Sequence, residues 1–252
     1  GPQSNHCRVT AATAAQLGMK CILVVNGHPP DPLTGNALLM DIFGAELRPV
    51  AGRADRAPAM EAAAREEEAE GRKAVVIPLG ASTPLGALGY VQAAIELDQQ
   101  MEGRGGWPPG LTWIFLASSS CGTLAGLALG FTLLGRENVR LVGISPDVTE
   151  EEIRRVTGEI AMGAGKLLGW EGDIPPKLIT PDDRFVGDGY GIPSKASKEA
   201  TRIFGSSAGV VLDPVYTSKA GAGFIHWIRA GKIPAGDTAL FWHTGGAPAL
   251  FT

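Results

Sequence analysis

Short apolar segments alternate with helical patterns along almost the whole of this 252-residue chain. This alternation is typical of a parallel β-sheet covered by helices on both faces, so the predicted fold class is α/β. The expected strands are short and bounded by glycine, proline or charge, as buried parallel strands are: 21–25, 74–78, 113–117, 141–144, 209–212 and 239–242. The expected helices fill the intervals: 9–17, 37–43, 59–70, 85–101, 124–134, 150–168, 196–204 and 220–230.

No polar, low-complexity linker divides the chain, so we expect one folding unit with two lobes. The small lobe is expected over approximately 1–110 and the large lobe over approximately 111–252. The charged run at 62–72 is interpreted as the solvated face of a helix.

Composition limits the classes of partner. With 44% hydrophobic and 19% charged residues, the chain can bury a sizeable core, and its net charge of −4 provides no basic surface for nucleic acid or an anionic membrane. No apolar run reaches the ~18 residues of a membrane span. The three cysteines lack the spacing of a zinc site or a disulfide framework, so no metal is expected and a reducing cytoplasm is favoured. Small-molecule partners are therefore expected.

The most informative loop is Ser-Ser-Ser-Cys-Gly-Thr-Leu-Ala-Gly at 118–126, between an expected strand and an apolar helix. Small residues let backbone N–H groups approach an anion, hydroxyls add donors, and a helix N-terminus favours negative charge. The pattern indicates a phosphate-binding loop. The alternative from this loop alone is an ordinary N-cap on a tightly packed helix.

Three further segments have the composition of a ligand site. Gly-Asp-Gly-Tyr-Gly-Ile-Pro at 187–193 flanks Tyr190 with glycines, which suits a ring presented to a ligand but also a plain turn. The segments 213–219 and 241–248 each follow an expected strand, and open α/β sheets place ligands at the carboxyl ends of their strands.

At these residues the chain resembles the family of D-cysteine desulfhydrases and aminocyclopropane-carboxylate deaminases, which are pyridoxal-phosphate enzymes of fold type II. Six motifs match in the family's order, over essentially the whole chain: Gln-Ser-Asn-His at 3–6, Ser-Thr-Pro-Leu-Gly-Ala-Leu-Gly-Tyr at 82–90, the loop at 119–126, Gly-Tyr-Gly-Ile-Pro at 189–193, Asp-Pro-Val-Tyr-Thr at 213–217 and His-Thr-Gly-Gly-Ala-Pro at 243–248. Six ordered matches would rarely arise by chance.

The resemblance implies a two-lobed fold similar to the tryptophan synthase β subunit, with pyridoxal phosphate bound between the lobes. It implies that Ser4, Tyr190 and Tyr216 are catalytic and that Asn5 faces the ring hydroxyl. The remaining cofactor-binding residues would hold the phosphate and the ring: Ser119, Ser120, Cys121, Gly122, Thr123, Leu124, Thr217 and Thr244. A phosphate, sulfate or cofactor phosphate is expected within hydrogen-bond reach of 120–123. The partners implied are a small amino-acid substrate and a second copy in a homodimer.

In the family, the lysine that anchors the cofactor lies some tens of residues before the Gln-Ser-Asn motif. Here that motif begins at Gln3, so we expect the lysine and a first strand upstream, with an exposed apolar face near 9–25. Lys219 is interpreted as a surface charge at the start of a helix. Two classes of function therefore stay open: a lyase or deaminase whose lysine lies upstream, which we favour, and a non-catalytic relative that binds a ligand or partner in the same cleft.

Two threonines indicate the branch of the family. The deaminase branch typically has glutamate after the tyrosine of Asp-Pro-Val-Tyr and leucine at the position of Thr244, whereas this chain has Thr217 and Thr244. A hydroxyl stabilises a protonated ring nitrogen less than a carboxylate does, because charge-assisted hydrogen bonds are about twice as strong as neutral ones. The resemblance therefore predicts elimination from D-cysteine, giving pyruvate, ammonia and sulfide, rather than opening of a cyclopropane ring.

Overall fold

The computed structural model describes residues 1–252, which divide into two compact units. The first contains residues 1–79 and 247–252, and the second contains residues 80–246. The division between these units lies near Leu79, whereas the sequence predicts the boundary between the lobes at approximately residue 110. Helix α4 (Pro84–Gly103) explains this position. Its buried Ala87, Val91 and Ala94 belong to the same hydrophobic core as the helix at 122–133 of the second unit.

The first unit is built on two parallel strands, β1 (Ile22–Asn26) and β2 (Glu46–Val50). Its core joins Leu23 and Val25 of β1 to Ala11 and Met40, which come from two helices. The helices of this unit are α1 (Asn5–Gln16), α2 (Gly35–Ile42) and α3 (Arg56–Ala69), and the short 3-10 helices η1 (Leu79–Ala81) and η3 (Ala247–Leu250) lie at its chain boundaries.

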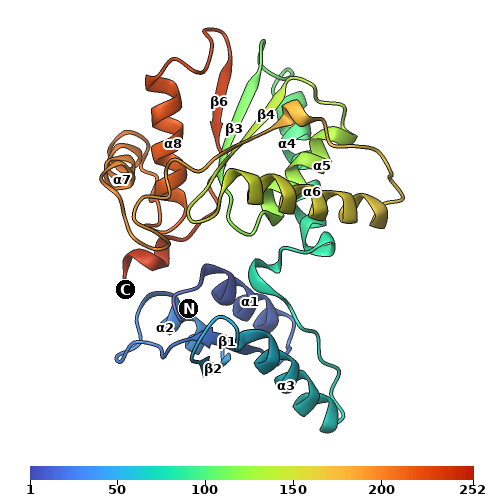
Figure 1. Ribbon diagram of the computed structural model, residues 1–252, viewed down its shortest axis with the longest axis vertical. Helices are drawn as coiled ribbons and strands as arrows, with labels where there is room; N and C mark the ends of the chain where they lie inside the picture. The colour runs from blue at the N-terminus through green and yellow to red at the C-terminus, as the bar shows by residue number, and fades with distance from the viewer. The chain divides into compact units, whose positions relative to one another are not determined.

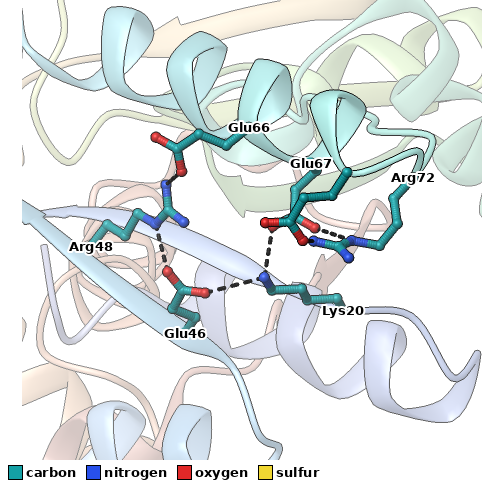
Figure 2. Close-up of polar contacts among 7 residues, drawn as sticks. Lys20, Glu46, Arg48, Glu66, Glu67 and Arg72 are labelled. Carbon is teal, nitrogen blue, oxygen red and sulfur yellow. Dashed lines mark hydrogen bonds and ion pairs between the residues drawn. The ribbon is translucent and has the colours of Figure 1, made fainter.

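An ionic network joins α3 to the two-stranded sheet (Figure 2). Lys20 Nζ lies 2.7 Å from Glu67 Oε1 and 3.6 Å from Glu46 Oε2, and Glu46 in turn pairs with Arg48 at 2.6 Å. Arg72 also pairs with Glu67, and this hydrogen bond, together with that from Lys20, lowers the pKa of the Glu67 carboxyl to about 2. Apart from Glu67 and Arg48 these side chains are well exposed, so the network contributes little to the stability of the unit.

The second unit contains a four-stranded parallel sheet in the order β5-β4-β3-β6. Its strands are β3 (Thr112–Ala117), β4 (Val139–Ile144), β5 (Ile179–Asp182) and β6 (Thr238–Phe241). Besides α4, its helices are α5 (Gly122–Leu133), α6 (Glu150–Leu167), α7 (Lys195–Ala208), α8 (Thr217–Arg229) and the 3-10 helix η2 (Pro176–Leu178).

Helices cover both faces of this sheet (Figure 1). Ile114 and Leu116 of β3 point to the face covered by α4, α5 and α6, whereas Phe115 between them packs against Trp227 of α8. Successive side chains of a strand point to opposite faces, so a strand buried on both faces has a nearly continuous apolar sequence. None of the helices is both long enough and apolar enough to cross a bilayer.

The predicted α/β class is confirmed, and all eight predicted helices are present. Two predicted strands are wrong, because 74–78 and 209–212 form no ladder; Val75 and Val211 there are 70% and 48% exposed. Two strands were missed, β2 and β5, which contain Pro49 and Pro181 beside charged residues. Proline is tolerated on edge strands, which both of these are, but it obscures their sequence pattern. The predicted exposed apolar side chains near 9–25 are found at Val9, Leu17 and Met19.

Gly126 of α5 tests how closely α4 and α5 pack. A Cβ added there would lie 2.3 Å from the Ala87 carbonyl oxygen and 2.5 Å from Tyr90 Cβ. We expect Gly126→Ala to lower the free energy of unfolding by about 1–3 kcal/mol, because helix backbones must separate. The matched control is Gly158→Ala in α6, where an added Cβ meets nothing within 4 Å and should stabilise by about 0.5–1 kcal/mol. Urea unfolding measures both; equal effects would contradict the argument.

Candidate functional site

The loops that follow β3, β4, β5 and β6 lie at one edge of the second unit's sheet, because parallel strands share a direction. This edge contains the residues 118–121, 145–149, 183–194 and 242–246. The carboxyl edge of a parallel sheet is where α/β proteins bind ligands. The predicted loops of this unit are therefore brought together as expected.

The loop before α5 presents backbone donors at a helix N-terminus. Cys121 has φ of +65°, in the left-handed region that non-glycine residues rarely adopt, and it is followed directly by Gly122, the first residue of α5. The first N–H groups of a helix have no acceptor within the helix. Here the N–H groups of Thr123 and Leu124 belong to this set, and Leu124 can contribute only its N–H, because its side chain is buried in the core.

Ser82 is part of this loop's surroundings, although sequence reasoning did not select it as a site residue. Its hydroxyl donates to Ser120 Oγ at 2.7 Å and accepts from Gly122 N at 3.2 Å. A Cβ added to Gly80 would lie 2.4 Å from Ser120 Oγ, so glycine is needed there. The signal that could have identified Ser82 is its motif at 82–90, which starts α4.

The two predicted catalytic tyrosines lie in contact. Tyr190 Oη and Tyr216 Oη are 2.5 Å apart, and their ring centroids are 5.8 Å apart at an interplanar angle of 72°. Burial, the nearby Tyr190 and the hydrogen bond between them raise the pKa of the Tyr216 hydroxyl far above its usual value. Tyr216 is therefore protonated at neutral pH and can donate a hydrogen bond, and the raised pKa makes its hydroxyl a weaker acid than that of an ordinary tyrosine.

The buried carboxylate of Asp213 organises the start of α8. Its Oδ1 accepts from the N–H groups of Val215 and Tyr216, both at 2.8 Å, and its Oδ2 accepts from Thr217 N and Thr217 Oγ1, both at 3.0 Å. The Thr217 hydroxyl also accepts from Asp213 N at 2.7 Å. The proton of this hydroxyl is thus directed to Asp213, and the structure gives Thr217 a role in shaping the turn that sequence reasoning did not foresee.

Thr244 lies in the segment after β6. It is exposed, and the residues around it are held: the His243 ring bonds to Val211 O at 2.9 Å through Nε2 and accepts from Gly245 N at 3.1 Å through Nδ1. The hydroxyl of Thr244, in contrast to that of Thr217, has no hydrogen-bond partner within the protein. It is available to a ligand.

Ser4 and Asn5 belong to the first unit, where they start α1. The Ser4 hydroxyl caps the helix by accepting from Cys7 N at 3.2 Å. Asn5 Oδ1 accepts from Nδ2 of Asn36 at 2.8 Å, and Asn36 is itself wholly buried and bonded to Gln3. This leaves the Nδ2 group of Asn5 as the donor for a ligand. Asn36 orients Asn5 and was missed, because a single asparagine at the start of α2 has no sequence signal.

Lys219 corrects a prediction. It is wholly buried and not a surface charge, and its ammonium donates to the carbonyl oxygens of Pro146, Val186 and Gly189 at 3.0, 2.7 and 2.7 Å. Burial lowers the pKa of this ammonium. The carbonyls that bind it come from loops distant in sequence, which no local pattern could reveal.

Comparison with known proteins identifies the family. A family model described as pyridoxal-phosphate dependent enzyme matches residues 1–245. The chain belongs to this family. It is 40% identical to a D-cysteine desulfhydrase of Salmonella paratyphi B, over 99% of this chain and 75% of that protein. Membership of a family of enzymes does not favour the alternative of a non-catalytic relative.

Solved structures of related proteins agree on the fold. The crystal structure of an ACC deaminase homologue superposes with a TM-score of 0.85 at 35% identity, covering 100% of this chain and 73% of that one. A serine racemase from Dictyostelium discoideum is 14% identical to this chain and superposes with a TM-score of 0.60. The match covers 97% of this chain and 74% of the racemase chain, so the two proteins share the fold. The predicted fold type II architecture and the predicted cofactor, pyridoxal phosphate, are thereby confirmed.

The loop before α5 fits the phosphate of this cofactor. Gly122 packs against Ser82, since an added Cβ would lie 2.7 Å from Ser82 Oγ, and its N–H donates to the same hydroxyl. The N–H groups of Thr123 and Leu124 at the start of α5, together with the hydroxyls of Ser119, Ser120 and Thr123, form a donor set suited to a phosphate dianion. The residues present can therefore hold the group that the family uses.

Thr217 tests whether the α8 turn depends on a hydroxyl. We expect Thr217→Val to lower the free energy of unfolding by about 1–3 kcal/mol, because it leaves the buried Asp213 N–H and one carboxylate oxygen each short of a partner. Thr217→Ser keeps the hydroxyl and should cost much less. Thermal or urea unfolding of both variants measures the difference. If valine is tolerated as well as serine, the hydroxyl is not needed for the turn.

Proposed function

We propose that this pyridoxal-phosphate-dependent lyase eliminates sulfide from D-cysteine. In the balanced reaction, D-cysteine and water give pyruvate, ammonia and hydrogen sulfide. The observation that carries the proposal is the start of α8, where the residue after Tyr216 is a threonine committed to Asp213, so this position supplies no carboxylate. The identity to D-cysteine desulfhydrases supports it.

When bound, pyridoxal phosphate supplies an electron-withdrawing ring that stabilises negative charge at the substrate carbon after a proton is removed. The strength of this withdrawal depends on what faces the ring nitrogen. In our proposal Thr217 and Thr244 lie at this side of the ring. Because the Thr217 proton is directed to Asp213, Thr244 is the threonine with a free hydroxyl, and a neutral hydroxyl holds a protonated nitrogen only weakly.

A weak electron sink distinguishes two reactions. Sulfide is a good leaving group, so its loss from the β-carbon needs only weak electron withdrawal by the cofactor ring. Opening a cyclopropane ring breaks a carbon–carbon bond and needs stronger electron withdrawal. The start of α8 therefore favours elimination. Related amino acids with a leaving group on the β-carbon are expected to react by the same route.

The roles of the side chains follow from their contacts. The loop 119–124 binds the phosphate, and Asn5, oriented by Asn36, donates to the ring hydroxyl. The hydroxyls of Tyr190 and Tyr216 lie 2.5 Å apart, close enough for a proton to move between them. We assign the two tyrosines to proton transfer at the substrate and Ser4 to its carboxylate or reacting carbon.

We propose a homodimer in the cytoplasm as the setting. Cys7, Cys21 and Cys121 are all free thiols, as expected in a reducing compartment. The family resemblance supports the dimer. Light scattering on the purified holoenzyme tests it, and a monomer would overturn this part of the proposal.

The substrate is tested by assaying the complete holoenzyme with D-cysteine and with aminocyclopropane carboxylate. We expect pyruvate and sulfide from D-cysteine at a kcat/KM at least about tenfold above that for 2-oxobutyrate release, a difference of about 1.4 kcal/mol in barrier. L-cysteine is the stereochemical control. Faster release of 2-oxobutyrate would overturn the substrate, although not the family.

The tyrosine pair is tested by removing one hydroxyl at a time. We expect Tyr190→Phe and Tyr216→Phe each to lower kcat by about 10²–10⁴-fold, the usual contribution of a positioned acid or base, while cofactor binding is kept. Tyr90→Phe is the matched control, since Tyr90 packs against the core and is the third tyrosine of the chain. Wild-type kcat in both site variants would remove the tyrosines from the mechanism.

A further inference from the structure

Lys219 is a charged side chain with an unusual environment. It is 0% exposed, and all three N–H donors of its ammonium are used by neutral carbonyl oxygens, those of Pro146, Val186 and Gly189. No carboxylate forms an ion pair with it. The charges that act on it from nearby are those of Asp147 and Asp188.

Burying the Lys219 ammonium in this arrangement costs folding free energy. A buried ammonium loses its hydration, and the first turn of α8, where Lys219 lies, carries the positive end of the helix dipole. An apolar side chain of similar length would fill the same space without either cost, but it would leave the carbonyl oxygens of Pro146, Val186 and Gly189 without these donors. The presence of lysine therefore needs a reason other than packing.

The three carbonyls show what the ammonium holds. Pro146 lies in the turn after β4, whereas Val186 and Gly189 lie in the loop after β5. Gly189 has φ of +136°, a conformation that only glycine adopts readily, and its carbonyl directly precedes Tyr190. Lys219 thus fixes the backbone on the N-terminal side of Tyr190.

The other end of Tyr190 is fixed by the same helix. Its hydroxyl bonds to that of Tyr216, which lies three residues before Lys219 at the start of α8. Tyr190 is therefore held at its backbone by Lys219 and at its hydroxyl by Tyr216. The turn that presents both residues is itself fixed by Asp213.

We propose that Lys219 is a positioning residue whose ammonium acts as an internal cation, holding the Tyr190 loop on α8 so that the two tyrosine hydroxyls stay in contact. The proposal rests on the proposed function only in assigning the tyrosines to catalysis. Its physical content, a cation that joins two loops to one helix, is independent of the substrate.

The first test measures how firmly the Tyr190 loop is held, without any reaction. Amide hydrogen exchange of the holoenzyme follows the loop at 183–194, which carries Tyr190. In Lys219→Met, which keeps the length and removes the charge, we expect faster exchange in this loop and unchanged exchange in α5, because the carbonyl oxygens of Val186 and Gly189 lose their donor. Unchanged exchange of the loop in a folded Lys219→Met protein would overturn the proposal.

The second test measures kinetics and rescue. We expect Lys219→Met to lower kcat by about 10²-fold with little change in KM, the effect of a small displacement of a catalytic group. In Lys219→Ala the carbonyl oxygens face a space that a small cation can enter, so methylammonium or potassium should restore part of the kcat and slow the amide exchange of the Tyr190 loop. Tetramethylammonium is too large and serves as the control. Equal effects of all three cations would contradict an internal cation.

A variant that leaves Lys219 in place covers the case in which its substitution prevents folding. Gly189→Ala strains the backbone at φ of +136° and displaces the carbonyl that Lys219 binds. We expect it to reproduce the loss of kcat and the faster amide exchange of the Tyr190 loop. Gly191→Ala is the matched control, because Gly191 lies in the same loop at φ of +76° and its carbonyl does not bind Lys219. Equal exchange in the two variants would overturn the proposal, whatever the substrate proves to be.

Discussion

The buried carboxylate of Asp213 is the contact on which the candidate site of the second unit depends. It accepts four hydrogen bonds from three residues, Val215, Tyr216 and Thr217, and thereby shapes the turn that starts α8. Gly246, after β6, approaches the same carboxyl so closely that an added Cβ would lie 2.7 Å from it. One side chain thus joins the turn of α8 to the segment that carries Thr244.

Two kinds of interaction build on this turn. Tyr216 and Lys219 lie one helical turn apart and hold the Tyr190 loop through a hydroxyl contact and an ammonium. The phosphate-binding loop is organised separately, by Ser82 and by the close approach of small residues to α5. The same edge of one sheet therefore combines the loop that we propose for phosphate binding with the tyrosine pair and the buried ammonium of Lys219.

Much of this could be predicted because the signals are local. The strand β3, with its continuous apolar sequence, and the loop 118–126 beside it have patterns that few other structures share. The family resemblance added what patterns could not supply, namely the cofactor and the proposal that Ser4, Tyr190 and Tyr216 act in one mechanism. The proline-containing edge strands β2 and β5 were missed because hydrogen bonding to one neighbour tolerates residues that a central strand excludes.

The sequence by itself determined the α/β class, the eight helices and the segments that bear the site, because periodicity and small-residue loops are properties of neighbouring residues. Only the tertiary structure decided the roles of Lys219, Thr217 and Asn36. A lysine at a helix start, a threonine after a tyrosine and a single asparagine each have an ordinary surface interpretation. Their hydrogen-bond partners Pro146, Asp213 and Asn5 come into contact with them only in the folded protein. Because a buried polar group must be hydrogen-bonded, each of these contacts then fixes the positions of both residues.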